Sequence, residues 1–394
     1  MLSYLVCFSM MAIFSIVASV SCRDSSGDSV DWFVGYKLPL IESDRSSLSG
    51  LSFLYADGRS ISWSLPQNIS SNQSAIGYTL SQLYSTLEDM GTFYMLYNDD
   101  HPGNGKVDPY RGHAKGVVVF NGDSGFWLIH SVPNFPATRQ YLYPSSGLRN
   151  GQSFLCISMK TDSLSSLATQ MLYIQPSIYL SQLPNEFASR YPDLQKVIGK
   201  KSLNKTAKVF YSVAQLVSQS GVQFTSFAKH KKFEKDIYSE LLAPKLRTSL
   251  LTETWLNGPD IYSELLAPKL RTSLLTETWL NGPGDLPSSC SSTYKVNNIV
   301  SVLIDGKQFK SSKDHSKWAV SADKRNPMLC IGDINRQKSQ SKRGGGTVCI
   351  RNAQLWHLYN GSVDEIEPCR SVASRPNWLT RLWKLVTGIF GNRN

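Results

Sequence analysis

Short runs of β-branched and aromatic residues alternate along this chain with segments in which apolar residues recur at helical spacing. Residues 117–120 and 126–129 flank the sequence Asn-Gly-Asp-Ser-Gly, which predicts two paired strands joined by a turn. The other clearly periodic segments are two predicted strands, 299–304 and 318–320, and two predicted helices, 76–87 and 206–217. Because no long structureless linker separates these elements, we predict two packed α/β units.

The composition is that of a folded, globular protein. Of the 394 residues, 41% are hydrophobic and only 18% are charged, which excludes a disordered polyampholyte. The 27 glycines and 7 cysteines exclude a collagen or a disulfide-stapled miniprotein. The formal charge of +11 is typical of proteins with an anionic partner, although it also serves solubility.

The first 21 residues are predicted to be a signal peptide. They carry no charged side chain, include the apolar run 11–17, and end in small residues, Ser19 and Ser21, that suit cleavage before Cys22. The alternative is an uncleaved membrane anchor. No other uncharged apolar segment approaches the roughly 20 residues that span a bilayer. We therefore expect a protein that is secreted or delivered to a lysosomal lumen.

The cysteines fit an oxidising compartment. Once Cys7 is removed with the signal peptide, six remain: Cys22, Cys156, Cys290, Cys330, Cys349 and Cys369. An even number in an exported chain predicts three disulfides, whose connectivity the spacing leaves open. The absence of a C-x-x-C pair argues against a zinc ribbon or a thioredoxin-type site. Four N-x-S/T sequons predict glycosylation at Asn68, Asn72, Asn204 and Asn360.

A 24-residue sequence occurs twice in tandem without a single change, over residues 236–259 and 260–283. Two identical units do not make a solenoid, which needs several diverged repeats. The repeat indicates a recent duplication or an error in assembling the sequence. Each copy has helical spacing interrupted by Pro244 or Pro268 and ends in an Asn-Gly-Pro turn. We expect one copy to fill its place in the fold and the other to bulge out or displace it.

Residues 370–394 form a basic tail. They include five basic residues and no acidic one, with Arg381 and Lys384 set among tryptophan, leucine and isoleucine. This pattern is typical of an amphipathic helix that binds an anionic membrane or another anionic surface. The alternative is a terminal helix packed on the body of the protein, or a frayed extension.

The candidate chemistry lies in two matching tripeptides. His113-Ala114-Lys115 and His315-Ser316-Lys317 each open a β-like run, so each histidine lies on the same strand face as its lysine. An asparagine follows each histidine at nearly the same distance, Asn134 after 21 residues and Asn335 after 20. The pair predicts two half-sites that face each other across a pseudo-twofold axis. The alternative is two surface histidines, each with its hydrogen bonds satisfied, beside solvated lysines.

Such a site suits the cleavage of a phosphodiester. A neutral imidazole can attack phosphorus while a second, protonated imidazole donates to the leaving oxygen. Two lysines can neutralise the non-bridging oxygens, and the asparagine amides can orient the imidazoles or add donors. The scheme requires no metal or other cofactor. The lysines should lower the pKa of the histidines, so acid restores the required proton and a bell-shaped pH profile is expected.

Several longer segments resemble the deoxyribonuclease II family. They are Val-Asp-Trp-Phe-Val-Gly-Tyr-Lys-Leu-Pro over 30–39, the blocks 112–116 and 125–136 around the first tripeptide, and the blocks 314–318, 330–336 and 343–347 around the second. The resemblance runs from about Cys22 to Cys369. It implies a secreted or lysosomal acid endonuclease, a hydrolase that cuts DNA without a metal and leaves 3′-phosphate ends.

The resemblance also implies a fold and a set of roles. The family is similar to phospholipase D-like proteins, a mixed α/β (α+β) class in which two halves with helix-flanked β-sheet cores form a pseudo-dimer, here residues 22–175 and 176–369. His113, Lys115, His315 and Lys317 match its catalytic positions. By analogy His113 is the nucleophile, which forms a phosphohistidine, and His315 the general acid, with the reverse assignment also open. His130 is either a supporting residue or a structural imidazole.

The disulfides implied by the resemblance are Cys22–Cys156, Cys290–Cys369 and Cys330–Cys349. Phe120 and Ala322 stand where the wider superfamily's signature has aspartate, which argues against lipid hydrolysis. Two alternatives stay open: a binding protein for nucleic acid or glycan that has lost activity through the duplication, and a phospholipase D-like lipid hydrolase tethered by residues 370–394. The expected partner is DNA, and an oligomer is compatible with the sequence.

Overall fold

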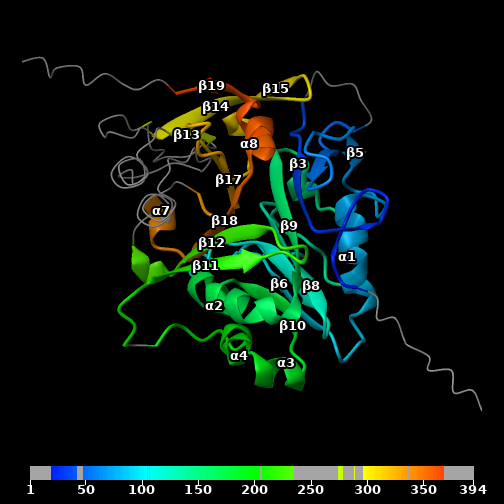
Figure 1. Cartoon of the computed structure of the whole chain (residues 1–394), viewed down its shortest axis with the longest axis vertical. Coiled ribbons are helices and arrows are strands. Elements are labelled where there is room, and N and C mark those ends of the chain that lie inside the picture. The colour runs from blue at the N-terminus through cyan, green and yellow to red at the C-terminus, as the bar shows by residue number, and fades with distance from the viewer. Residues whose placement is uncertain are drawn as a thin grey trace, which may run out of the picture.

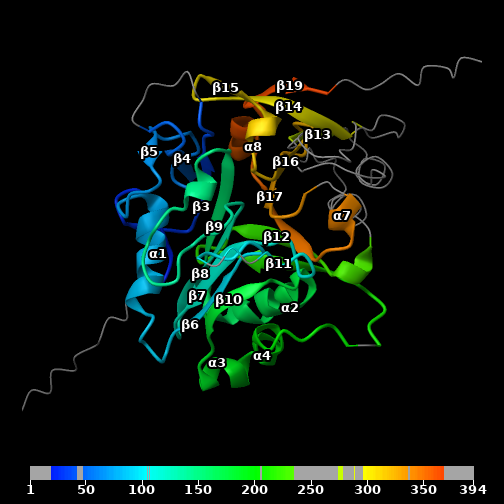
Figure 2. The ribbon, with the colours of Figure 1, turned by 180° about the vertical axis from the view of Figure 1, so that it is seen from behind.

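The computed structural model describes residues 19–41, 48–103, 105, 107–204, 206–234, 274–277, 288, 296–335 and 338–367. Two large β-sheets carry most of these residues, with helices on their flanks (Figures 1 and 2). A short ribbon of β1 (Cys22–Arg23) and β2 (Ser29–Val30) lies beside them. The mixed α and β class expected from the sequence is confirmed.

The first sheet has eight strands in the order β10-β6-β7-β8-β9-β3-β4-β5, and all neighbours are antiparallel. Its strands are β3 (Trp32–Lys37), β4 (Ser52–Asp57), β5 (Gln67–Asn68), β6 (Phe93–Tyr97), β7 (Gly116–Phe120), β8 (Ser124–His130), β9 (Gln152–Lys160) and β10 (Ile178–Gln182). Helix α1 (Ala75–Ser85) flanks this sheet, and the Ser74 side chain caps it by accepting from the amide of Gly77. β10 lies beyond residue 175, so this sheet extends past the boundary expected from the sequence.

The second sheet is built by nine of the described strands, in the order β11-β12-β18-β17-β16-β13-β14-β15 with β19 also paired to β14. These are β11 (Tyr211–Val217), β12 (Gln223–Lys229), β13 (Leu274–Glu277), β14 (Val296–Ile304), β15 (Lys307–Lys310), β16 (Trp318–Ser321), β17 (Met328–Gly332), β18 (Gly345–Arg351) and β19 (Val363–Ile366). The β13–β14 pair is parallel.

Helix α2 (Leu164–Ile174) links the two sheets, because it follows β9 of the first and packs against β11 and β12 of the second. The remaining helices are α3 (Asn185–Arg190), α4 (Pro192–Ile198), α7 (Lys338–Ser341) and α8 (Ala353–Asn360), with 3-10 turns η1 (Ser145–Gly147), η2 (Thr161–Ser163), η3 (Lys231–Phe233) and η6 (Ser311–Lys313). One hydrophobic cluster joins Val118 of β7, Leu167 of α2 and Ile350 of β18. The two sheets therefore share a core.

The predicted hairpin is confirmed, since β7 and β8 pair around the Asn-Gly-Asp turn. The predicted strands over 299–304 and 318–320 lie within β14 and β16, and α1 covers most of the predicted helix over 76–87. The predicted helix over 206–217 is wrong, because 211–217 form β11. Every residue of β11 pairs with β12, for example Tyr211 with Lys229, and this tertiary pairing overrides the apparent helical period.

The second copy of the repeat supplies a strand inside the second sheet. β13 corresponds to the Leu-Leu-Thr-Glu of residues 274–277 and lies between β16 and β14. The helix expected over each copy is therefore wrong for these residues. The first copy, and the rest of the second, lie outside the described residues.

Two of the implied disulfides are confirmed. Cys22–Cys156 ties β1 to β9, and Cys330–Cys349 joins facing residues of β17 and β18. The third pair, residues 1–18 and the tail lie outside the described residues. Val20, just before the expected cleavage site, is buried against the body, and of the sequon asparagines Asn72 and Asn204 are exposed. No helix in the described part of the chain is long and apolar enough to cross a membrane.

Candidate active site

The two H-x-K elements stand at the starts of strands from different sheets. His113 and Lys115 directly precede β7, whereas His315 and Lys317 directly precede β16. All four are buried, with exposed fractions of 7% for His113, 3% for Lys115, 8% for His315 and 2% for Lys317. The alternative of two surface histidines beside solvated lysines is therefore wrong.

Each imidazole is hydrogen-bonded by a loop that leaves the other sheet. His113 donates from Nδ1 to the backbone carbonyl of Asp333, which follows β17 of the second sheet. His315 donates from Nδ1 to the backbone carbonyl of Ser131, which follows β8 of the first sheet, over 2.9 Å. The two contacts are reciprocal, so neither sheet alone orients its own histidine.

The main chain repeats this exchange. The amide of His113 donates to the carbonyl of Gly344, and the amide of His315 donates to that of Gly151, each over 2.9 Å. A side chain at Gly344 would collide with the backbone of Ile174, which explains the glycine at this crossing. Since a carbonyl can only accept, Nδ1 of each imidazole carries its hydrogen, and in the neutral ring the lone pair is on Nε2.

Burial and neighbouring cations favour the uncharged form of both histidines. Burial lowers the pKa of His113 and of His315 well below the usual value, because a charged imidazole loses its hydration. Lys115 and Lys317 each lower the pKa of both histidines further, so each lysine acts on the histidine of the other H-x-K element as well as on its own. The carboxylate of Asp99 opposes this effect at His113.

The two lysines have different partners. Lys115 donates from Nζ to Oδ1 of Asp99, which also lies 3.8 Å from Nε2 of His113. Lys317 donates from Nζ to the backbone carbonyl of His315 over 2.8 Å. Burial alone would raise the pKa of Asp99, but the charges of Lys115, His113 and Arg343 outweigh it and hold that pKa well below its usual range. Sequence reasoning missed Asp99 because nothing near it marks it as part of the site.

His130 is fully buried, and its contacts are those of a structural residue. Its Nδ1 accepts from the amide of Val132, and the ring packs edge-on against Phe135. Its Nε2 has no hydrogen-bond partner among the described residues. Burial, and then Lys115, lower its pKa to about 3, so it stays neutral at acid pH. These contacts favour the structural role over the supporting one.

Asn134 and Asn335 follow the two histidines by 21 and 20 residues, and the contacts of Asn134 differ from the sequence expectation. Asn134 has a left-handed backbone, φ 56°, and its side-chain nitrogen donates to Asp100 Oδ1 over 2.7 Å and to the carbonyl of His101 over 3.1 Å. It therefore fixes the loop after β8 and does not bind an imidazole through these contacts. Asn335 is buried, with 5% exposed, three residues beyond β17.

A second set of unpredicted residues fixes the segment around His315. Tyr36 donates from its hydroxyl to Asp314, and Asp314 Oδ1 accepts from the amide of Ser316 over 2.9 Å. Gln152, at the start of β9, lies with Oε1 3.4 Å from Nδ1 of His315 and accepts from the Ser131 hydroxyl over 2.6 Å. Tyr36 falls in the segment 30–39, the part of the resemblance whose purpose the sequence did not reveal.

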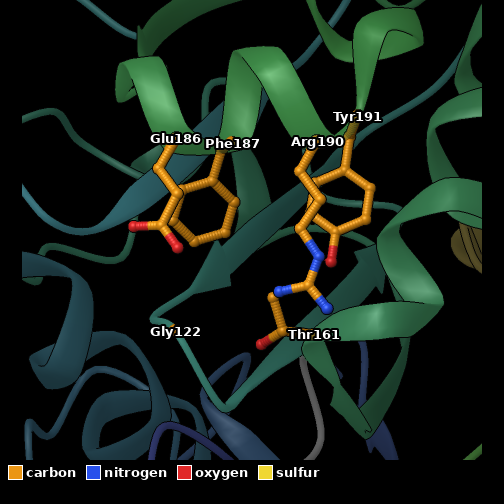
Figure 3. A pocket seen from close by; sticks show the side chains of 6 residues that line it. All are labelled: Gly122, Thr161, Glu186, Phe187, Arg190 and Tyr191. Atoms are coloured by element: carbon orange, nitrogen blue, oxygen red, sulfur yellow. The ribbon is translucent and has the colours of Figure 1, made fainter.

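A small cavity lies at the far end of β7 from His113. Its walls are Gly122, Thr161, Glu186, Phe187, Arg190 and Tyr191, with the side chains of α3 directed toward the β7–β8 turn (Figure 3). Its volume of 10 Å³ holds one water at most, which excludes it as a substrate site. Among the described residues no group of three His, Cys, Asp or Glu side chains is arranged to hold a metal ion.

Comparison with known proteins gives the family of this chain and its class, a deoxyribonuclease hydrolase. The family model for deoxyribonuclease II matches residues 21–260 and 257–369, two segments that overlap at 257–260, where the two repeat copies join. The chain belongs to the deoxyribonuclease II family.

Relatives in this family align with this chain over almost their whole length. Cell-death-related nuclease 7 of Caenorhabditis elegans is 40% identical over 364 residues, covering 91% of this chain and 92% of the relative. Deoxyribonuclease-2 of the same species is 36% identical, with 90% and 95% covered, and mouse deoxyribonuclease-2-alpha is 35% identical, with 89% and 94% covered. Among solved structures, yeast tyrosyl-DNA phosphodiesterase covers 64% of this chain and 71% of its own with a TM-score of 0.31 and 9% identity, a likeness too remote to bear on fold or function.

Proposed function

We propose that this deoxyribonuclease cuts DNA at acid pH without a metal ion, leaves 3′-phosphate and 5′-hydroxyl ends, and works through a phosphohistidine. The observation that carries the proposal is that His113 and His315 each donate from Nδ1 to a backbone carbonyl of the opposite sheet, which places the lone pair of each neutral ring on Nε2. The charges of Lys115 and Lys317 act on both rings. The same reciprocity supports the pseudo-dimer of two phospholipase D-like halves.

The reaction proceeds in two steps that use the same atoms. Nε2 of one histidine gives its lone pair to phosphorus, the P–O5′ bond breaks, and O5′ takes the proton from Nε2 of the other histidine. That second histidine then removes a proton from water, which attacks phosphorus while the N–P bond breaks and returns its electron pair to the first. The product carries the 3′-phosphate. Lys115 and Lys317 stabilise the charge on the non-bridging oxygens.

Acid operation follows from burial of the imidazoles. The general acid must be protonated. Burial, which removes hydration from the charged imidazole, and the neighbouring cations lower the pKa of both His113 and His315. Acid restores that proton, while further acidification also protonates the nucleophile and stops attack. The expected pH profile is therefore bell-shaped with its maximum on the acid side of neutrality.

The cellular setting is part of the proposal. The disulfides Cys22–Cys156 and Cys330–Cys349 are typical of an exported protein, which supports a secreted or lysosomal location. We propose DNA as the macromolecular partner, and the basic tail at 370–394 as a contact for an anionic membrane or other anionic surface.

The test is cleavage of supercoiled plasmid by the full chain in excess EDTA across pH 4–8, with the ends of the products analysed. We expect nicking in EDTA that peaks on the acid side, and ends that a ligase joins only after the 3′-phosphate is removed and the 5′-hydroxyl is phosphorylated. A requirement for added metal, activity that keeps rising above neutrality, or 5′-phosphate ends would overturn the proposal.

A further inference from the structure

Asp99 is a buried carboxylate at the centre of the site that the reaction scheme above does not use. It follows β6, and its side chain is 7% exposed. One oxygen accepts from Nζ of Lys115, and the other lies 3.0 Å from Nη1 of Arg343 and 3.8 Å from Nε2 of His113. A phosphodiester is an anion, so a carboxylate here requires an explanation.

Arg343 comes from the segment that enters β18 of the second sheet and reaches across to the first. Besides Asp99, its guanidinium donates to the carbonyls of Asp108 over 2.7 Å, Arg111 over 2.9 Å and Gly112 over 3.3 Å. These carbonyls lie in the loop that leads directly into His113. One planar guanidinium thus holds both the carboxylate and the chain beside it.

The backbone around Arg343 is fixed by hydrogen bonds from a lysine of the second sheet. Lys229, the last residue of β12, donates from its buried Nζ to the carbonyls of Gln340 over 2.9 Å, Ser341 over 2.9 Å and Arg343 over 2.6 Å. These carbonyls end the short helix α7 and the turn after it. The position of Asp99 is therefore set by a series of contacts that begins in the second sheet.

The two histidines consequently have unlike surroundings. His113 faces one carboxylate, Asp99, and the cations Lys115, Arg343 and Lys317. The charges that act most on His315 are those of the cations Lys317 and Lys115, and protonation of His113 would add a third positive charge. The pseudo-symmetry of the backbone is thus broken by charge.

We propose that Asp99 is a positioning residue of the active site, held by Arg343, which directs Lys115 and places a fixed negative charge beside Nε2 of His113. This inference rests on the proposed function. Lys115 would turn from Asp99 to the substrate phosphate while Arg343 retains the carboxylate. The charge near Nε2 favours the protonated form of His113, so it adjusts the pH range in which that imidazole works.

The test is steady-state cleavage by Asp99→Asn, which keeps the shape of the side chain and removes its charge. We expect kcat to fall by about 10- to 100-fold, because Lys115 and His113 lose their alignment. KM should not rise, since a negative charge has left the phosphate site. Without Asp99 the pKa of His113 falls, so one limb of the pH profile moves to lower pH: the acid limb if His113 is the nucleophile, the alkaline limb if it is the general acid.

Asp162→Asn is the matched control, because Asp162 pairs with Arg190 on the surface and is 80% exposed. It should keep the wild-type kcat and pH profile. Should Asp99→Asn prove unstable, the double variant Asp99→Asn/Arg343→Gln leaves no buried charge unpaired between these two residues. The limb is expected to move in the same direction but by less, because Arg343 itself lowers the pKa of His113.

A folded Asp99→Asn variant with wild-type kcat and an unmoved pH profile would overturn this inference while wild-type cleavage in EDTA still stood. If the wild type itself cleaves only with added metal, the proposed function fails first and this inference with it. Loss of kcat together with a large rise in KM and no shift of either limb would mark Asp99 as a residue of the fold alone, and would also overturn it.

Discussion

Nδ1 of His315 donates to the backbone carbonyl of Ser131 across 184 residues of chain, over a distance of 2.9 Å. Ser131 leaves the first sheet and His315 enters the second, and His113 makes the converse contact to Asp333. Because the acceptors are carbonyls, substituting Ser131 or Asp333 does not remove these bonds. The tautomer of each imidazole is therefore fixed by how the two sheets meet.

This arrangement predicts that both histidines are needed and that neither substitutes for the other. His113→Asn and His315→Asn should each lower kcat by about 10²- to 10⁴-fold, the usual contribution of a positioned acid, base or nucleophile. His357→Asn is the control, because His357 is exposed on α8. Plasmid cleavage by the three variants at matched concentrations measures this, and an active His315→Asn variant would contradict a shared site.

Asp333 is predicted to make stability depend on pH. Burial raises its pKa to about 7, although the amide of Gly346 and the charge of Lys115 act in the other direction. Between pH ~4 and ~7 the unfolded carboxyl is ionised while the folded one keeps its proton, so its contribution to stability falls as pH rises. The free energy of unfolding of the wild type relative to Asp333→Asn should fall by up to about 4 kcal/mol across this window.

Urea unfolding of both proteins at several pH values measures this difference. Asp323→Asn is a suitable comparison, because the hydrogen bond from Arg325 lowers the pKa of Asp323. Its effect on stability should be constant above pH ~4 and shrink only in stronger acid. A wild-type to Asp333→Asn difference that is flat from pH 4 to 7 would show that the carboxyl of Asp333 is not protonated in the folded state.

The repeat predicts unequal roles for two identical segments. Thr276 of the second copy pairs with Asn298 on one side and Ala319 on the other, in the interior of the second sheet. Thr276→Pro should cost about 3 kcal/mol or more, because proline lacks the donor that an interior strand uses. Thr252→Pro, at the same position in the first copy, should cost much less.

Thermal unfolding of the two proline variants distinguishes the copies. Equal losses of stability would contradict the assignment of β13 to the second copy. The single-copy chain provides an independent check: it should fold and cleave DNA, since one Leu-Leu-Thr-Glu segment is enough for the sheet. Deleting 236–259 or 260–283 gives the same sequence, so one protein serves for both deletions.

Local patterns predicted the elements whose stabilising contacts are local. The β7–β8 hairpin followed from strand-forming runs around a turn, and its partners are close in sequence. β11 was mistaken for a helix because its residues alternate only weakly between buried and exposed, and its pairing with β12 decides its structure. The strand in the second repeat copy was missed for a similar reason, since both its neighbours lie well downstream.

In the candidate site too, sequence patterns identify some residues and leave others hidden. The matching H-x-K tripeptides singled out His113 and His315, because the same tripeptide pattern occurs twice in the sequence. Asp99 and Arg343 are 244 residues apart, and nothing in the spacing of either relates it to the other. The backbone acceptors of the imidazoles are equally hidden, since any residue supplies a carbonyl.

The most direct test of the account is capture of the covalent intermediate. A 5′-labelled oligonucleotide is mixed with the full chain in EDTA at acid pH, quenched in alkali, in which phosphohistidine survives, and separated under denaturing conditions. We predict label attached to the protein and mapped to the peptide of His113 or of His315, and lost when that histidine is changed to asparagine. Label on neither peptide, with rapid cleavage in the same samples, would contradict the mechanism.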